Sequence, residues 1–255
     1  MLTHLLFMLF VAIAVYIQNL TGFALALVLL GLVGVADLVP LPDAVNAVTI
    51  LLIVNALMFF YRRRTARVER AIMPAVAASL VGALAGMALL TFLAAAEYEV
   101  LRMILGLSVV ACAVLLWRAA SPLKETSSAI YFTFVGSLSG VLGGMFSAAG
   151  PPLVYAAYRQ PWPLERIQDS LVFSFAVGAV LRLIVMLATG NFSTLAILLA
   201  IEAIPVTLLV TALSANRPPP FSRGSIKHAV CILLVVSGVG MLISSMQAMH
   251  QSLSF

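Results

Sequence analysis

Several polar side chains interrupt long apolar stretches of this sequence, and their chemistry suits the binding of an anion. Gln18, Asn19 and Thr21 lie close together, while Arg182 stands alone inside a later apolar stretch. Amides, hydroxyl groups and a guanidinium all donate hydrogen bonds to an anion. Glu202 lies in a further apolar stretch, where its carboxyl group could carry a proton.

A second place of interest is rich in small residues. It reads Gly140-Val141-Leu142-Gly143-Gly144, followed closely by Ser147-Ala148-Ala149-Gly150-Pro151-Pro152. Small residues allow a backbone to approach a ligand closely. The candidate substrate-binding residues are Gln18, Asn19, Thr21, Gly22, Asn55, Ser139, Gly143, Gly144, Ser147, Gly150, Pro151 and Arg182. Glu202 is kept apart as the candidate coupling residue.

Each candidate also has a purely structural interpretation. Glycines spaced four apart are typical of close helix packing in membranes. This spacing occurs at Gly136, Gly140 and Gly144 and again at Gly82 and Gly86. Gln18 and Asn19 could instead lock a local turn. Arg182 could pair with Glu202 across adjacent helices, or extend to the outer interface.

No arrangement typical of catalysis or of metal binding accompanies these residues. The sequence contains no GxGxxG, Walker or HExxH motif. Cys112 and Cys231 lie in apolar runs, and His4, His228 and His250 lie at segment ends. We therefore expect no enzyme, no metal site and no cofactor.

The composition identifies the solvent around these residues as lipid. Of the 255 residues, 63% are hydrophobic and 9% are charged, and the mean hydropathy is +1.15. A water-soluble domain carries roughly 25% charged residues, and a disordered chain needs low hydrophobicity. The net charge of +5 does not indicate nucleic acid, because membrane proteins concentrate Lys and Arg in cytoplasmic loops. The sequence predicts an all-α polytopic membrane protein.

Ten apolar segments are predicted to be helices, since a spanning helix needs about 20 mostly apolar residues. They are 4–19, 22–38, 43–61, 71–93, 98–118, 127–143, 147–159, 164–189, 192–213 and 226–247. The first two segments have almost no linker between them, and neither do the sixth and seventh. Each of these pairs is expected to form a broken, re-entrant hairpin whose tip is buried in protein or faces water.

The basic residues predict the orientation, because Lys and Arg gather in cytoplasmic loops. Twelve of the 14 lie in the linkers 61–71, 118–126, 158–166 and 214–227. If each hairpin returns to its own side, all twelve face the cytoplasm and both termini lie outside. The start of the chain lacks the basic region of a cleavable signal peptide, so the first segment is expected to be retained. We expect a bacterial inner-membrane protein with both termini in the periplasm.

The same topology predicts two inverted repeats, each with one hairpin and three transmembrane helices. The predicted units are 1–118, a cytoplasmic linker 119–126, and 127–255. A shift of 121 residues superposes Gly22 on Gly143, Pro40 on Pro161 and Pro42 on Pro163. Inverted repeats with interrupted helices are typical of secondary transporters, whose substrate binds near the midplane. The second arm of each hairpin would point its positive helix N-terminus at an anion there.

The two hairpins resemble those of the TauE/SafE family of sulfite exporters, the four-toluene-sulfonate uptake permease group. The resemblance rests on Gln18-Asn19-Leu20-Thr21-Gly22-Phe23 with Pro40 and Pro42, and on the glycine- and proline-rich segment 140–152. It differs at Phe23-Ala24-Leu25-Ala26, where many relatives have more glycine. The resemblance implies transport of sulfite, sulfonates or related organosulfur anions, often outward.

Together these observations predict alternating access, with Arg182 and the hairpin tips holding the anion. A potential of about 100 mV gives about 2.3 kcal/mol per elementary charge, so a uniporter would suffice for export. Two alternatives stay open: proton-coupled uptake through Glu202, and a non-transporting membrane component that binds anionic lipid head groups. The expected partners are a small anion and the lipid bilayer, without nucleic acid. A homodimer, the direction of flux and the coupling are also left open.

Overall fold

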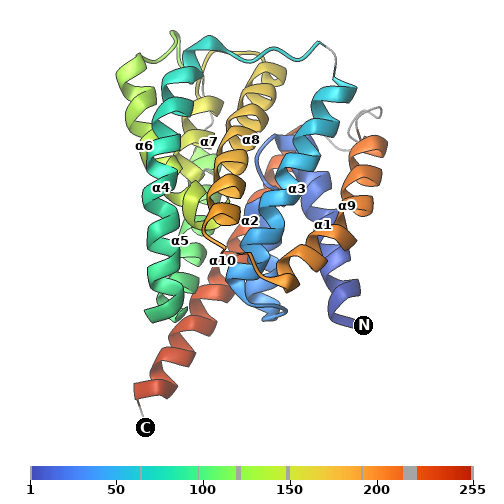
Figure 1. The fold of residues 1–255 in the computed structure, drawn as a ribbon. Helices are drawn as coiled ribbons and strands as arrows, with labels where there is room; N and C mark the ends of the chain where they lie inside the picture. The colour runs from blue at the N-terminus through green and yellow to red at the C-terminus, as the bar shows by residue number, and fades with distance from the viewer. Residues whose placement is uncertain are drawn as a thin grey trace.

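The computed structural model is a bundle of α-helices in the residues that it describes, which are 2–63, 65–96, 98–118, 122–147, 150–190, 192–214 and 223–253 (Figure 1). The helices are α1 (Leu2–Thr21), α2 (Leu25–Ala36), α3 (Leu41–Arg62), η1 (Arg70–Ile72), α4 (Met73–Ala96), α5 (Tyr98–Arg118), α6 (Ala129–Phe146), α7 (Gly150–Tyr158), α8 (Leu164–Ala188), α9 (Thr194–Ser214) and α10 (Arg223–Leu253). Each predicted apolar segment corresponds to one α-helix, so the prediction of an all-α fold is confirmed.

Seven helices in the described part of the chain are long and apolar enough to cross a membrane, namely α1, α3, α4, α5, α6, α8 and α9. Two shorter apolar stretches are Leu25–Ala36, which is α2, and Cys231–Gln247, which lies within α10. The chain is therefore a multi-pass membrane protein. Helix α10 continues to Leu253, beyond the predicted end at residue 247.

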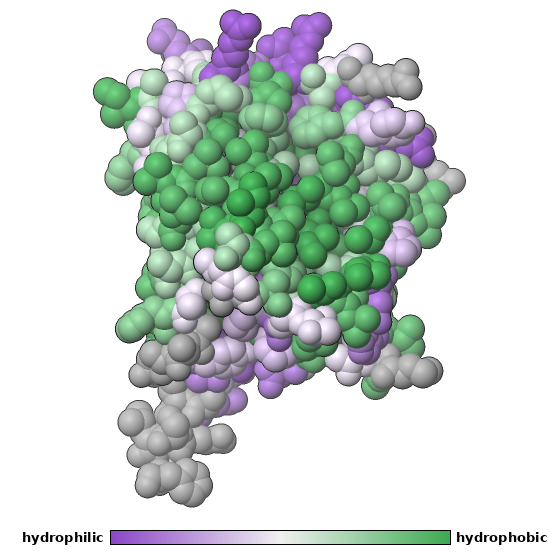
Figure 2. Space-filling model, viewed as in Figure 1, coloured by the Kyte–Doolittle hydropathy of each residue, from purple (hydrophilic) through white to green (hydrophobic). Residues whose placement is uncertain are grey.

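The surface has the polarity that a lipid bilayer requires. Hydrophobic residues cover the middle of the molecule, and hydrophilic residues gather at its two ends (Figure 2). Large apolar side chains such as Leu57, Val81 and Phe134 are exposed on the surface of the protein. The linkers after α3 and α7 lie at one end, and the two termini lie at the other (Figure 1).

Each predicted hairpin consists of a long helix and a short helix joined by one short turn. We call residues 22–24, between α1 and α2, the first hairpin turn. We call the connection between α6 and α7 the second hairpin turn; of it the structure describes Ser147. Gly22 has φ +85° and Ser147 has φ 54°, both in the left-handed region. This conformation ends a helix, is easy for glycine and costs a serine strain.

Most of the helix pairs that pack together have a counterpart when the first five α-helices are exchanged for the second five. Helix α4 packs against α6 and its counterpart α9 against α1, while α5 packs against α7 and α10 against α2. Helices α3 and α8 pack against each other, as do α5 and α10. Pro40 is the N-cap of α3 and Pro163 that of α8. The offset between these starts is 123 residues, so the predicted shift of 121 is two residues short there.

Helices α4 and α6 approach each other so closely that side chains are excluded from the contact. A Cβ atom on Gly140 would lie 2.3 Å from the backbone oxygen of Ser79, and one on Gly86 would lie 2.0 Å from that of Val141. Backbone atoms cannot move aside as a flexible side chain can. The packing interpretation of the glycine spacing is therefore the one that the geometry favours.

We predict that Gly140→Ala destabilises the protein by about 1–3 kcal/mol, the usual cost of overpacking a tight contact. The measurement is the midpoint of thermal unfolding of the detergent-solubilised protein. Gly178→Ala is the matched control, because a Cβ atom there meets nothing within 4 Å. Equal midpoints for the two variants would contradict the predicted cost at the α4–α6 contact.

Candidate functional site

Arg182 is buried between three elements, with only 1% of its surface exposed. Its Nη1 donates hydrogen bonds to Asn46 Oδ1 at 2.9 Å and to Thr49 Oγ1 at 2.8 Å, both on α3. Its Nε donates to the carbonyl oxygen of Gly144 at 3.1 Å, near the end of α6. Arg182 therefore joins α8 to α3 and to the second hairpin.

The second hairpin turn is bound to the same part of α3. The hydroxyl oxygens of Ser147 and Thr49 lie 2.5 Å apart. Ser147 also donates to the carbonyl oxygen of Val45 at 3.3 Å. We call Asn46, Thr49, Gly144, Ser147 and Arg182 the Arg182 cluster.

The Arg182 cluster holds a positive charge that no acidic side chain of the described residues balances. All the hydrogen-bond partners of the guanidinium are neutral, and its Nη2 has no partner among the described residues. A guanidinium is planar, and its Nη2 lies beside Nε on one edge of the fork. Because Nε faces Gly144, the free Nη2 lies on the side of the second hairpin. The two N–H bonds of this free Nη2 can donate charge-assisted hydrogen bonds to the oxygen atoms of an anion.

The N-terminus of α7 offers fewer donors than expected from the sequence. Gly150 begins the helix, and neither Pro151 nor Pro152 has a backbone N–H group. The N–H group of Leu153 donates to Ser139 Oγ at 2.8 Å. Most donors that a helix N-terminus normally presents are therefore absent or used here. Positive charge at this turn comes from Arg182 rather than from backbone amides. Gly143, just before the turn, is half-buried.

The first hairpin turn is held by its own side chains. Gln18 Oε1 accepts the N–H group of Leu25 at 2.9 Å, and Gln18 Nε2 donates to the carbonyl oxygen of Gly22 at 3.4 Å. Thr21 Oγ1 donates back to Ile17 within α1. Gln18 thus caps the start of α2. This is the structural interpretation of Gln18, in which its side chain locks a local turn.

A third polar cluster joins α1, α3 and α9. Asn55 Nδ2 donates to Asn19 Oδ1 at 3.0 Å and to Thr211 Oγ1 at 2.9 Å. Asn19 Nδ2 donates to Ser214 Oγ at 2.9 Å. Asn19 and Asn55 thus share one hydrogen bond, and Asn55 Oδ1 has no partner among the described residues. The described contacts do not connect either residue to Arg182.

The alternative pairing of Arg182 with Glu202 is wrong. Glu202 Oε2 lies 2.6 Å from His4 Nδ1, so its partner is a histidine on α1. The alternative that Arg182 extends to the interface is also wrong, because the side chain is fully buried. Both charges instead meet polar groups on other helices, which is how a membrane interior accommodates them.

The two hairpin turns lie at different depths rather than at one level. Gln168, near the start of α8, donates to the carbonyl oxygen of Leu20 at 2.7 Å, and a Cβ on Gly22 would lie 2.9 Å from its Cα. Arg182 meets the second hairpin farther along the same helix. The two contact points are 14 positions apart in α8, about 21 Å at a rise of 1.5 Å per residue. The expected convergence of both tips on one cavity is not what the contacts show.

Asn46 and Thr49 are site residues that were not predicted. They lie three positions apart in an otherwise apolar part of α3, so they share one helix face. That spacing was the available signal, but only Asn55 was singled out in this segment. Gln168 was also missed, because it lies near the polar end of α8.

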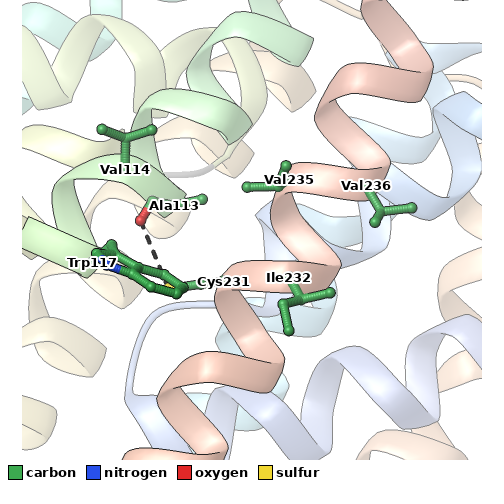
Figure 3. Close-up of a pocket in the computed structure, with 7 residues that line it drawn as sticks. All are labelled: Ala113, Val114, Trp117, Cys231, Ile232, Val235 and Val236. Atoms are coloured by element: carbon green, nitrogen blue, oxygen red, sulfur yellow. Dashed lines mark hydrogen bonds between the residues drawn. The ribbon is translucent and has the colours of Figure 1, made fainter.

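Two other features of the described residues were considered for ligand chemistry. A hollow of about 430 Å³ lies between α5 and α10 and is lined by Ala113, Val114, Trp117, Cys231, Ile232, Val235 and Val236 (Figure 3). Its apolar lining suits hydrocarbon rather than an anion.

No group of His, Cys, Asp and Glu that could hold a metal ion occurs within the described residues.

Comparisons with known proteins agree with the membrane architecture. The model of the family described as "Sulfite exporter TauE/SafE" matches residues 6–241. The chain is 25% identical over 233 residues, 91% of each protein, to a protein of Cupriavidus necator described as "Probable sulfite/organosulfonate exporter TauE". No solved structure gives a significant match. A family of exporters is one of transporters rather than enzymes.

We predict that Gln18→Met destabilises the protein by about 1–3 kcal/mol, because the buried N–H group of Leu25 loses its acceptor. Methionine keeps the length of the side chain and removes only its polar atoms. The check is the thermal unfolding midpoint against Ile13→Met, a change at a lipid-exposed position of the same helix. A midpoint for Gln18→Met equal to that of the control would show that the cap contributes little.

Proposed function

Because the chain belongs to the TauE/SafE family of sulfite exporters, we propose that it exports sulfite or a related organosulfur anion. The name of its relative in Cupriavidus necator mentions the same class of substrate. The proposed location is a bacterial inner membrane, with the basic linkers in the cytoplasm and both termini in the periplasm. The positive-inside rule and the shared end of the two termini (Figure 1) support this orientation.

The observation that carries the proposal is the unbalanced buried charge of Arg182. Leaving a charge unpaired in a protein interior is costly. Among the described residues no carboxylate pairs with this guanidinium, and its Nη2 is free. Such a site gains most from an external anion. Sulfite and sulfonates carry their charge on several oxygen atoms of one sulfur, and one or two of these oxygens could accept the N–H groups of Nη2.

Neutral donors around Arg182 would allow release as well as binding. The hydroxyl groups of Thr49 and Ser147 lie next to the guanidinium network. A hydroxyl can turn its hydrogen toward an incoming oxygen or back toward the backbone. The bound anion is therefore held by one full charge and by adaptable groups, an arrangement suited to moderate affinity.

The transport cycle that we propose is alternating access between two inverted repeats. The repeats are supported by the helix pairs that keep a counterpart when the halves are exchanged, such as α5 with α7 and α10 with α2. In the cycle, one set of helices rocks against the other and opens the Arg182 cluster to each side in turn. A membrane potential of about 100 mV, negative inside, favours the exit of one negative charge by about 2.3 kcal/mol.

The contact between His4 and Glu202 favours a second candidate, proton-coupled transport. His4 Nδ1 and Glu202 Oε2 lie 2.6 Å apart, and in this candidate Glu202 is the coupling residue. We predict that, if coupling operates, Glu202→Gln abolishes the dependence of flux on a pH gradient while leaving potential-driven flux. Flux that ignores the pH gradient in the unmodified protein would exclude this candidate.

We predict that Arg182→Gln lowers sulfite flux at least 10- to 100-fold, since a charge-assisted hydrogen bond contributes about 1.5–3 kcal/mol and about 1.4 kcal/mol is a factor of ten. Asn46→Asp should have a similar effect, because its carboxylate would occupy the guanidinium. Asn46→Leu is the matched control, since it removes the same amide without adding charge and should keep more flux.

The measurement is sulfite flux into proteoliposomes under an imposed potential, normalised to folded protein. Sulfate and acetate serve as competing anions. Full flux through Arg182→Gln would remove Arg182 from the site. An unmodified protein without flux of sulfite or any sulfonate would contradict the proposed function itself.

A further inference from the structure

A second arginine lies at the other end of the contact between α3 and α8. Arg63, directly after α3, pairs with Asp169 on α8, with Nη1 and Oδ1 3.1 Å apart. The other carboxylate oxygen of Asp169 accepts the backbone N–H group of Arg67 at 2.9 Å. Asp169 is 3% exposed, while the side chain of Arg63 is 30% exposed. A buried carboxylate of the chain is thus held as a bound anion would be.

This pair is the counterpart of the Arg182 cluster under the exchange of the two halves. Helices α3 and α8 start at Leu41 and Leu164, an offset of 123 residues. The same offset relates Asn46 to Asp169. Asn46 is contacted by Arg182 from within α8, and Asp169 is paired with Arg63, which directly follows α3. The two arginines themselves are not related by the offset of 123 residues.

The two hairpin turns obey the same exchange. The second turn donates from Ser147 to the carbonyl oxygen of Val45. The first turn packs on Gln168, which is Val45 shifted by 123. Both turns therefore rest on the same position of the partner half, at opposite ends of the contact between α3 and α8.

The two ends of the contact between α3 and α8 differ in the charge of the residue that the arginine meets. Asn46 is neutral, so Arg182 keeps an unbalanced charge. Asp169 is an acid, so the charge of Arg63 is neutralised within the chain. Arg63 also approaches Gln168, with Nη1 3.4 Å from Oε1, and Gln168 in turn holds the carbonyl oxygen of Leu20. The ion pair is thereby connected to the first hairpin turn.

We propose that Arg63 is the entry site for the substrate anion at the basic, cytoplasmic end, and that Asp169 is a tethered carboxylate that occupies this site at rest. An incoming sulfite or sulfonate displaces Asp169 from Arg63, which frees Gln168 and loosens the first hairpin turn. The exposed third of the Arg63 side chain gives the anion its access. This inference rests on the proposed function and adds a second binding position with its own internal competitor.

The test compares Asp169→Asn with Glu69→Gln. Asparagine keeps the shape of the side chain and an oxygen for the N–H group of Arg67, and it removes the competing charge. Glu69 pairs with Arg166 at 2.6 Å in the same linker contact, so Glu69→Gln is matched for charge and place. The first readout is the KM for sulfite on the cytoplasmic and on the periplasmic side, in vesicles of defined orientation.

Asp169→Asn is expected to lower the cytoplasmic KM about tenfold, which is about 1.4 kcal/mol, and to leave the periplasmic KM unchanged. Glu69→Gln should change neither. In an Arg63→Gln background the effect of Asp169→Asn should disappear, because the carboxylate acts through that guanidinium. Equal effects of Asp169→Asn with and without Arg63 would overturn the proposal.

A second readout does not depend on which anion is transported. Thr21→Cys, in a chain whose Cys112 and Cys231 are replaced by alanine, reports the exposure of the first hairpin turn to a polar thiol reagent. Labelling from the cytoplasmic side should be several-fold faster with Asp169→Asn than with Glu69→Gln. If the unmodified protein carries no sulfite, the proposed function fails, and the labelling still decides the role of Asp169. Equal labelling rates would contradict it.

Discussion

The structure depends on how one buried guanidinium is satisfied inside a membrane protein. Arg182 uses two of its three nitrogen atoms to join α8 to α3 and to the second hairpin, and all its partners are neutral. Removing a cation from water without a counter-charge is unfavourable. In the proposed function, the remaining nitrogen atom and the unbalanced charge are what would stabilise an anion. The proposal of anion transport follows from this one constraint.

The surrounding helices provide the geometry that this interaction needs. Backbone contact between α4 and α6 holds the long arm of the second hairpin in place. Pro151 and Pro152 remove backbone donors from the start of α7, so an anion in the proposed site would rely on the Arg182 side chain rather than on a helix N-terminus. On exchange of the two halves the same frame appears again at Arg63, where Asp169 supplies the counter-charge internally. At one end of the contact between α3 and α8, Arg182 has no acidic partner among the described residues. At the other end, Arg63 is paired with Asp169.

The helices and the candidate charge were predictable because their signals are local. Apolar runs and the prolines at helix starts indicate where the segments begin and end. A lone arginine in such a run is visible in the sequence as a candidate functional residue. The partners of Arg182 on α3 were not predictable, since Thr49 and Arg182 are 133 positions apart in the chain and meet only through helix packing. The pairing of Glu202 with His4 was not predicted for the same reason. The depth of the two turns depends on helix tilt and packing, which periodicity does not encode.

The most direct test of the central claim is to locate a bound anion. Selenite has the shape and charge of sulfite and scatters X-rays anomalously at the selenium edge. In crystals soaked with selenite, the account predicts an anomalous peak within hydrogen-bonding distance of Arg182 Nη2, beside Ser147. A peak confined to another part of the protein, with Arg182 unoccupied, would contradict the account.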